Sequence, residues 1–181
     1  NKPLISYHQH SQLQKVDHIL KLLKEGKNLA LVSDAGTPGI SDPGNKLVEE
    51  VIKSLSDKVN IVSIPGPSAL TAAVSVSGFP MDRFLFLGFP PAKKKRQKFF
   101  QEVLKSKHPV IFYESSHRIL KTLKELKELA PYYHCHGNGN TGDLEMPKIV
   151  VCQELTKMFE TIYRGSLEEV MVQMNKKDLR G

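Results

Sequence analysis

The feature that most constrains the fold is a loop rich in glycine, proline and aspartate, residues 33–44 (SDAGTPGISDPG). It follows the apolar run 29–32 and precedes a helix-spaced apolar run, residues 47–52, so we expect a strand, a loop and a helix in that order. Glycine permits positive φ and lets a ligand approach the backbone, whereas proline stiffens a turn. Because open α/β sheets bind ligands at the carboxyl ends of their strands, this pattern indicates a ligand-binding loop.

The charges in this loop narrow the class of ligand. Asp34 and Asp42 can accept hydrogen bonds from an amine or from ribose hydroxyls, and their negative charge makes the loop a poor phosphate cradle. The loop also lacks the lysine of a Walker loop and the G-x-G-x-x-G spacing of a dinucleotide fingerprint. A tight strand-to-helix turn needs Asp, Gly and Pro as well. The length of the loop exceeds what such a turn requires, so we favour the ligand-binding interpretation.

A second glycine and proline turn follows the next expected strand. Residues 59–64 are apolar and β-prone, and Pro65–Ser68 (PGPS) leads into an expected helix, residues 69–77. Alternating strands and helices predict parallel pairing with right-handed crossovers, so both turns should lie at the same sheet edge and face one pocket. The alternative is a plain helix N-cap by Ser68. The pairing of the two turns favours a ligand site, since backbone amides at a helix start suit a carboxylate.

The second half of the chain also alternates between strand and helix patterns. We expect strands at residues 84–89, 109–113, 148–152 and 159–163, and an amphipathic helix over residues 119–129. A Ser-x-x-Glu pattern at Ser166 and Glu169 predicts the start of a last helix. Residues 131–147 contain several glycines and no apolar period, so they are expected to form a long loop.

Four sequence blocks occur in order along the chain: residues 33–44, Ile64–Ala69 (IPGPSA), Tyr113–Arg118 (YESSHR) and Glu154–Lys157 (ELTK). Together they resemble the 16S rRNA (cytidine-2'-O)-methyltransferase family of the tetrapyrrole methylase superfamily. The resemblance implies a two-domain α/β fold, with a parallel sheet in the N-terminal domain, a mixed sheet in the C-terminal domain and a cofactor cleft between them. We place the cofactor-binding domain at residues 1–79 and the substrate domain at residues 80–181.

The resemblance also implies a reaction. It predicts methyl transfer from S-adenosylmethionine to the ribose 2'-oxygen of a cytidine in 16S rRNA of the small ribosomal subunit. Family members are often dimers, so the resemblance also allows a homodimer and leaves the oligomeric state open. Two alternatives remain open: a methylase of the same fold that acts on a tetrapyrrole-type small molecule or a protein, and a non-catalytic RNA-binding fragment. The residues that inherit cofactor binding by position are Asp34, Gly36, Thr37, Pro38, Pro67, Ser68 and Ala69.

Members of the resembled family carry a further segment before the position of Asn1, with a first strand and a glycine-containing loop. They also continue past the position of Gly181 with a final strand. We therefore expect the chain to be a fragment, with the first domain incomplete at its start and the second incomplete at its end.

A basic segment favours an RNA partner. The chain carries a net charge of +7, and its densest cluster of cations is residues 93–98 (KKKRQK), followed by Phe99 and Phe100. Such a cluster can contact phosphates, although a solvated first helical turn with a core-facing aromatic pair has the same composition. In the resembled family, a basic segment at this position is associated with rRNA. The expected substrate-binding residues are Lys93, Lys94, Lys95, Arg96 and Arg118.

The catalytic residues are harder to choose from sequence. Methyl transfer from a sulfonium requires alignment of the nucleophile and removal of a proton from the hydroxyl, so positioning should dominate. The candidates for proton transfer or substrate activation are Glu114, His117, Glu154 and Lys157. No spacing decides among them, and we favour Lys157 or Glu154.

Neither a metal nor a membrane is expected. Cys135 and Cys152 are the only cysteines, and their spacing does not suit zinc. No apolar run approaches the roughly 20 residues of a membrane-spanning helix. We therefore expect a cytoplasmic protein without a metal site.

Overall fold

The computed structural model describes residues 2–8, 13–56, 58–134 and 147–175. Its Cα positions divide the chain into two compact units, Asn1–Ser68 and Ala69–Gly181. Helix α3 (Ala69–Ser77) belongs to the second of these units. The domain boundary expected after residue 79 stays a prediction.

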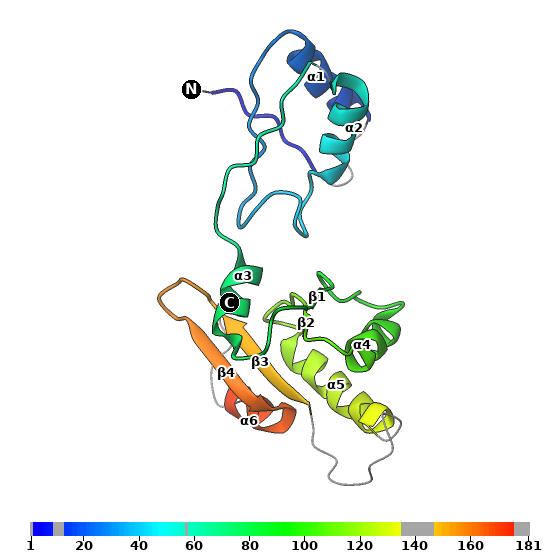
Figure 1. Ribbon diagram of the computed structural model, residues 1–181, viewed down its shortest axis with the longest axis vertical. Coiled ribbons are helices and arrows are strands. Elements are labelled where there is room, and N and C mark those ends of the chain that lie inside the picture. The colour runs from blue at the N-terminus through cyan, green and yellow to red at the C-terminus, as the bar shows by residue number, and fades with distance from the viewer. Residues whose placement is uncertain (1, 9–12, 57, 135–146, 176–181) are drawn as a thin grey trace. The chain divides into compact units, whose positions relative to one another are not determined.

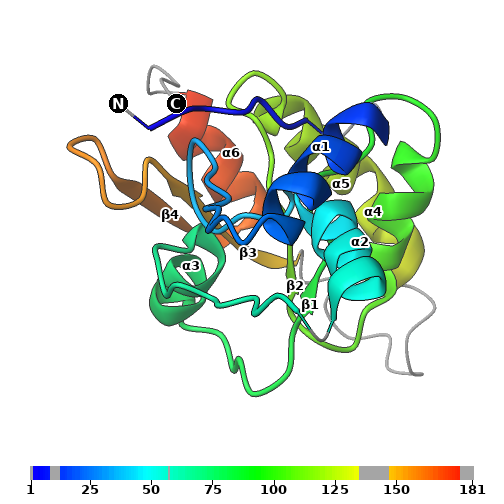
Figure 2. The ribbon, with the colours of Figure 1, turned by 90° about the horizontal axis from the view of Figure 1, so that it is seen from above.

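The first unit is built on two packed helices. Helix α1 (Leu13–Lys24) lies against α2 (Asn45–Leu55), as the blue and cyan ribbons of Figure 2 show. The predicted helix after the loop is confirmed. Burial of one apolar face from each helix stabilises the pair, because apolar surface removed from water contributes roughly 25 cal/mol per Å². The buried core residues are Ile19, Leu20, Leu47, Val51 and Leu55.

Residues 29–33 and 59–64 differ from the expectation of two parallel strands. Both segments run without a hydrogen-bonded partner strand among the described residues of the first unit. Val32 is 76% exposed and Ile64 is 78% exposed. A strand is stable only when its amides and apolar face find neighbours, so these sequences remain extended connections in the structure.

The second unit contains two small sheets (Figure 1). Strand β1 (Leu85–Phe86) pairs in parallel with β2 (Val110–Ile111), with Leu85 opposite Val110. Strand β3 (Lys148–Gln153) pairs antiparallel with β4 (Thr161–Ser166). The α/β class and the mixture of parallel and antiparallel pairing are confirmed, with strands shorter than predicted at residues 84–89 and 109–113.

Three helices cover these sheets and enclose a second core. They are α4 (Arg96–Lys105), α5 (Ile119–His134) and α6 (Leu167–Asn175), with α5 packed between the other two. Phe100 is 1% exposed, which confirms that this aromatic side chain belongs to the core. The buried cluster consists of Phe100, Leu123, Leu126, Tyr163, Leu167, Val170 and Met174.

Helix α5 extends further than predicted. We expected a loop from Pro131, but the helix continues through Pro131 to His134. Proline removes one backbone donor and disfavours the helical conformation of the residue before it. Both effects fall in the last turn, where little helix remains to be disrupted. Residues 135–146 of the predicted loop lie outside the described residues.

The start of α6 is confirmed as a capping box. The backbone N–H of Ser166 donates to Glu169 Oε2 at 2.8 Å, and the N–H of Glu169 donates to Ser166 Oγ at 3.3 Å. These two reciprocal bonds satisfy donors that a helix start leaves unpaired. Hydrogen bonding from Ser166 lowers the pKa of the Glu169 carboxyl. A serine and a glutamate three residues apart therefore predicted a boundary correctly.

Candidate functional site

The glycine and proline loop of the first unit folds back on itself. Ser33 Oγ donates to the carbonyl of Ala35 at 3.1 Å, and Asn45 Nδ2 of α2 donates to the carbonyl of Gly39 at 3.0 Å. Gly36, Gly39 and Gly44 have φ values of 70°, 85° and 146°. Only glycine adopts such angles readily, so the loop has a shape that its sequence specifies.

The structure brings this loop to the second turn. Thr37 Oγ1 donates to the carbonyl of Pro67 at 3.4 Å, although the two residues are 30 positions apart. Thr37 and Pro38 are half-buried, while Asp34, Gly36 and Pro67 are exposed. The two turns are thus in contact, but the described residues of the first unit form no sheet edge for them, and a shared pocket stays a prediction.

The surface around Asp34 and Gly36 suits a polar ligand. Asp34 presents an exposed carboxylate, and among the described residues no atom beyond the chain neighbours of Gly36 lies within 4 Å of where a Cβ on Gly36 would stand. An ionised carboxylate accepts charge-assisted hydrogen bonds from ammonium groups and hydroxyls. Asp34 can therefore accept hydrogen bonds from a ligand that carries an ammonium group or hydroxyls.

The glycines of this loop yield a prediction on stability. A Cβ on Gly44 would lie 2.9 Å from Leu31 Cδ2, and one on Gly39 would lie 2.5 Å from Asn45 Oδ1. We expect Gly44→Ala or Gly39→Ala to lower the free energy of unfolding by about 2–3 kcal/mol, since left-handed strain adds to the steric conflict. Gly36→Ala is the matched control, with positive φ but open space, and should cost about 1 kcal/mol. Urea unfolding measures the three variants. Equal losses at all three positions would contradict the close packing of this loop.

A buried ion network lies in the second unit around Glu114, between β2 and α5. The Glu114 side chain is 2% exposed. Its Oε1 accepts from Arg118 at 2.7 Å and from the N–H of Ser115 at 2.8 Å. Its Oε2 accepts from Thr122 Oγ1 at 2.7 Å and from Arg96 at 3.4 Å. The carboxylate is thus fully engaged by groups of the protein, which is typical of a structural anchor.

Arg96 lies on the other side of this network rather than on the surface. Its Nε donates to Glu125 at 2.6 Å, and its terminal nitrogens donate to Glu114, Thr122 and the carbonyl of Pro91. A guanidinium has five N–H donors, and the structure gives Arg96 five acceptor contacts. Its Cζ also stands 4.8 Å from the ring centroid of Phe100. The expected contact between Arg96 and RNA is not supported by this position, because no in-plane donor remains for a phosphate.

Arg118 differs from Arg96 in the same network. Its side chain is 31% exposed. It donates to Glu114, to Ser115 Oγ at 3.4 Å and to the carbonyl of Pro90 at 3.4 Å. Two of its five donors have no acceptor among the described residues. Arg118 therefore keeps the capacity to contact a phosphate.

The loop between β3 and β4 brings Glu154 and Lys157 together. Lys157 Nζ lies 3.0 Å from Glu154 Oε1, with side-chain exposures of 65% and 19%. Glu154 and Thr156 adopt positive φ values of 53° and 66°, and the N–H of Thr156 donates to Glu160 Oε2 at 2.6 Å. Non-glycine residues in this conformation are held by their surroundings and concentrate at functional sites. Within the described chain, no hydrogen bond or ion pair joins this loop to His117, which is exposed.

The predicted lysines remain at the surface. Lys93, Lys94, Lys95 and Lys98 are exposed, and Lys95 precedes α4 with a φ of 66°. Thr122 and Glu125, which complete the Arg96 network, were not predicted. A signal for the burial of Arg96 was present, since Arg96 and Phe100 are four residues apart on one helical face.

The amino-acid sequence of this chain is similar to those of known proteins. Residues 5–171 match the sequence model of the tetrapyrrole (corrin/porphyrin) methylases. The chain is 39% identical over 176 residues to the ribosomal RNA small subunit methyltransferase I of Thermotoga maritima, covering 97% of this chain and 72% of that protein. Proteins of the same name from Halalkalibacterium halodurans and Bacillus subtilis are 36% and 39% identical. The match covers 98% and 99% of this chain and 56% of each relative. The chain thus spans little more than half the length of these two relatives.

Proposed function

This chain belongs to the tetrapyrrole methylase family, and we propose that it is an S-adenosylmethionine-dependent methyltransferase that modifies a cytidine 2'-oxygen in small-subunit 16S rRNA. The observation that carries the proposal is the similarity over nearly the whole chain to proteins named ribosomal RNA small subunit methyltransferase I. The exposed lysines at residues 93–95 and the net charge of +7 support a polyanionic substrate.

The cofactor half of the site is assigned to the first unit. When bound, the sulfonium of S-adenosylmethionine supplies the methyl group, and its sulfur takes the electron pair of the broken carbon–sulfur bond. Asp34 accepts hydrogen bonds from the ammonium or the ribose hydroxyls of the cofactor. The remaining proposed cofactor-binding residues of this unit belong to the two turns that meet at the Thr37 and Pro67 contact: Gly36, Thr37, Pro38, Pro67 and Ser68. Ala69, the first residue of α3, follows directly on Ser68 and completes the proposed set.

The substrate half is assigned to the second unit. The ribose hydroxyl must lose its proton as its oxygen binds the methyl carbon, so a carboxylate and a nearby cation both help. Glu154 and Lys157 provide this combination at 3.0 Å on a loop held in unusual backbone conformations. Arg118 contacts a phosphate through its remaining donors, and His117 stays a further candidate for proton transfer. We assign Glu114 to orienting Arg118, since both of its oxygens are engaged.

A methylation assay tests this proposal. Small ribosomal subunits that lack the modification are incubated with the protein and with methyl-labelled S-adenosylmethionine. We expect label in 16S rRNA that is recovered as 2'-O-methylcytidine after nuclease digestion and mass spectrometry. Large subunits are the control and should remain unlabelled. Label on a base, on ribosomal protein or on no acceptor contradicts the proposal.

A family member that acts on a small molecule would give a different result. Tetrapyrroles carry several carboxylates, so basic residues alone do not distinguish them from RNA. Competition separates the two classes, because a small-molecule methylase should retain full activity on its own acceptor in the presence of excess rRNA.

A further inference from the structure

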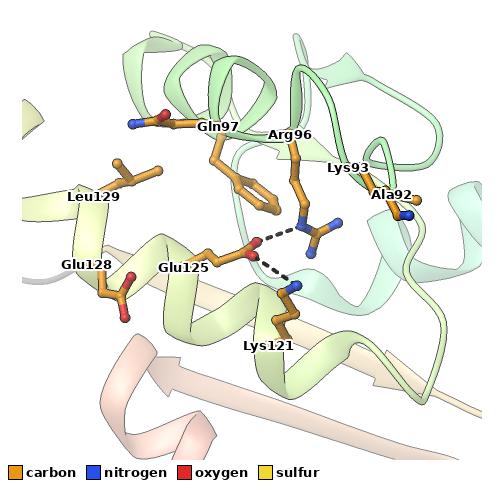
Figure 3. Close-up of a pocket in the computed structure, with 9 residues that line it drawn as sticks. Ala92, Lys93, Arg96, Gln97, Lys121, Glu125, Glu128 and Leu129 are labelled. Carbon is orange, nitrogen blue, oxygen red and sulfur yellow. Dashed lines mark hydrogen bonds and ion pairs between the residues drawn. The ribbon is translucent and has the colours of Figure 1, made fainter.

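Helices α4 and α5, with the residues just before α4, line an open groove of about 380 Å³ in the second unit, which we call the α4–α5 groove. Figure 3 shows its two sides, with Arg96 and Gln97 on α4 and Lys121, Glu125 and Glu128 on α5. The volume falls within the roughly 300–1,000 Å³ typical of small-ligand sites. The groove is therefore large enough for one nucleotide.

The groove offers two kinds of recognition chemistry. Lys93 and Lys121 supply ammonium groups, and Lys121 is 68% exposed with Glu125 3.8 Å away. Pairs of this length at the surface hold a lysine weakly, so Lys121 is available to a phosphate. Glu128 supplies a carboxylate that only accepts hydrogen bonds, and Gln97 supplies an amide that both donates and accepts. The lysine ammonium groups can bind a phosphate, and the carboxylate and amide can bind the polar edge of a nucleobase, so together they suit a nucleotide.

Arg96 lines the groove but has no hydrogen-bond donor left for a ligand. Its five acceptor contacts leave no in-plane donor, and the ring of Phe100 lies 4.8 Å from its Cζ. The ion pair with Glu125 at 2.6 Å holds the guanidinium in place. The Arg96 side chain is 7% exposed, so it forms part of the floor of the groove and holds α4 and α5 together there. The groups left to recognise a ligand are the exposed side chains at the rim of the groove.

We propose that the α4–α5 groove holds one unstacked nucleotide of a single-stranded RNA segment. Lys93 and Lys121 contact its flanking phosphates, and Gln97 and Glu128 bind the edge of its base. This inference rests on the proposed function, since it gives a place to part of the RNA substrate. Lys94 and Lys95 directly follow Lys93 in the chain and are also exposed, so further cations are available to phosphates near that residue.

The phosphate contact is tested by salt dependence. Binding of fluorescent single-stranded RNA to the whole chain is measured by anisotropy at several salt concentrations, without S-adenosylmethionine. Lys121→Gln should weaken binding about three- to tenfold and reduce the salt slope by about 0.7, since one fewer phosphate is neutralised. Lys124→Gln is the matched control, with an exposed lysine on the same helix that does not line the groove. Equal effects of the two substitutions overturn the proposal, because they indicate a diffuse basic surface.

The base contact is tested by base preference. Glu128 can accept from the exocyclic amino groups of cytosine and adenine, which uracil lacks. Oligo-C or oligo-A should therefore bind about two- to tenfold more tightly than oligo-U. Glu128→Gln should reduce this preference, whereas Glu102→Gln on the outer surface of α4 should preserve it. Equal affinity for all three oligonucleotides overturns the proposal.

These measurements separate failure of the groove from failure of the proposed function. A protein whose RNA binding depends on Lys121 and Glu128 but which methylates no rRNA refutes the proposed reaction alone. A protein that methylates 16S rRNA while its RNA affinity ignores both substitutions refutes the groove alone.

Discussion

Glu114→Ala should lower the free energy of unfolding by about 3–5 kcal/mol, the largest effect that we expect from any single substitution in the second unit. The Glu114 carboxylate is 2% exposed and accepts from two arginines, a hydroxyl and a backbone N–H. Its removal leaves the buried Arg96 with one carboxylate partner, Glu125, and leaves the Thr122 hydroxyl without an acceptor. Buried donors that lose their acceptors cost their full desolvation penalty. Urea unfolding monitored by circular dichroism measures the loss.

An exposed ion pair provides the control for this prediction. Glu49 and Lys53 of α2 lie 2.6 Å apart, and both side chains are more than half exposed. Glu49→Ala should leave the urea unfolding midpoint nearly unchanged, because solvent screens such pairs. If Glu114→Ala costs no more than Glu49→Ala, the network around Glu114 does not stabilise the fold.

A second substitution at this position, Glu114→Gln, decides between two roles for Glu114. A general base contributes to the reaction and not to folding, so Glu114→Gln would then abolish methylation while leaving the unfolding midpoint unchanged. An anchor gives the opposite result, with a lower midpoint and activity that is retained by the folded fraction at low temperature. The geometry favours the anchor.

Arg96 is buried and its lysine neighbours are exposed, a difference that the sequence alone did not predict. Lys93, Lys94, Lys95 and Arg96 form one run of cations, and composition gives no reason to separate them. The helical register separates them, because Arg96 shares a face with the buried Phe100 while the lysines lie at the surface. The main partner of Arg96, Glu125, is 29 residues away. Only the packing of α4 against α5 brings these charges together.

Helix boundaries were predictable where the contacts that define them join residues close together in the sequence. The Ser166 and Glu169 cap and the helix after the loop depend on neighbours within a few residues, and both were predicted correctly. The extended runs at residues 29–33 and 59–64 show the converse. Their residue types favour the extended β conformation. A strand also needs a hydrogen-bonded partner strand, which the described residues of the first unit do not provide.

The remaining expected result concerns the cofactor loop, where Asp34→Asn should weaken binding of S-adenosylmethionine by about ten- to a hundredfold. Asp34 presents an exposed carboxylate beside the open space at Gly36. A charge-assisted hydrogen bond from a carboxylate to an ammonium or a hydroxyl contributes roughly 1.5–3 kcal/mol, and the neutral amide loses most of it. Calorimetric titration with S-adenosylmethionine measures the change in Kd.

The control for Asp34 is Asp17→Asn, which removes the same charge from an exposed position on α1. It should leave the Kd within about twofold of the unmodified protein, since a charge on water-exposed α1 is largely screened. The unfolding midpoint must be measured for both variants, because Asp34 follows directly on Ser33, whose hydroxyl bonds within the loop. If Asp34→Asn lowers the midpoint and leaves the Kd unchanged, Asp34 shapes the turn and does not bind the cofactor. If the Kd rises while the midpoint stays constant, the carboxylate acts on the ligand itself, because the loop is then intact and only the hydrogen-bond acceptor has changed.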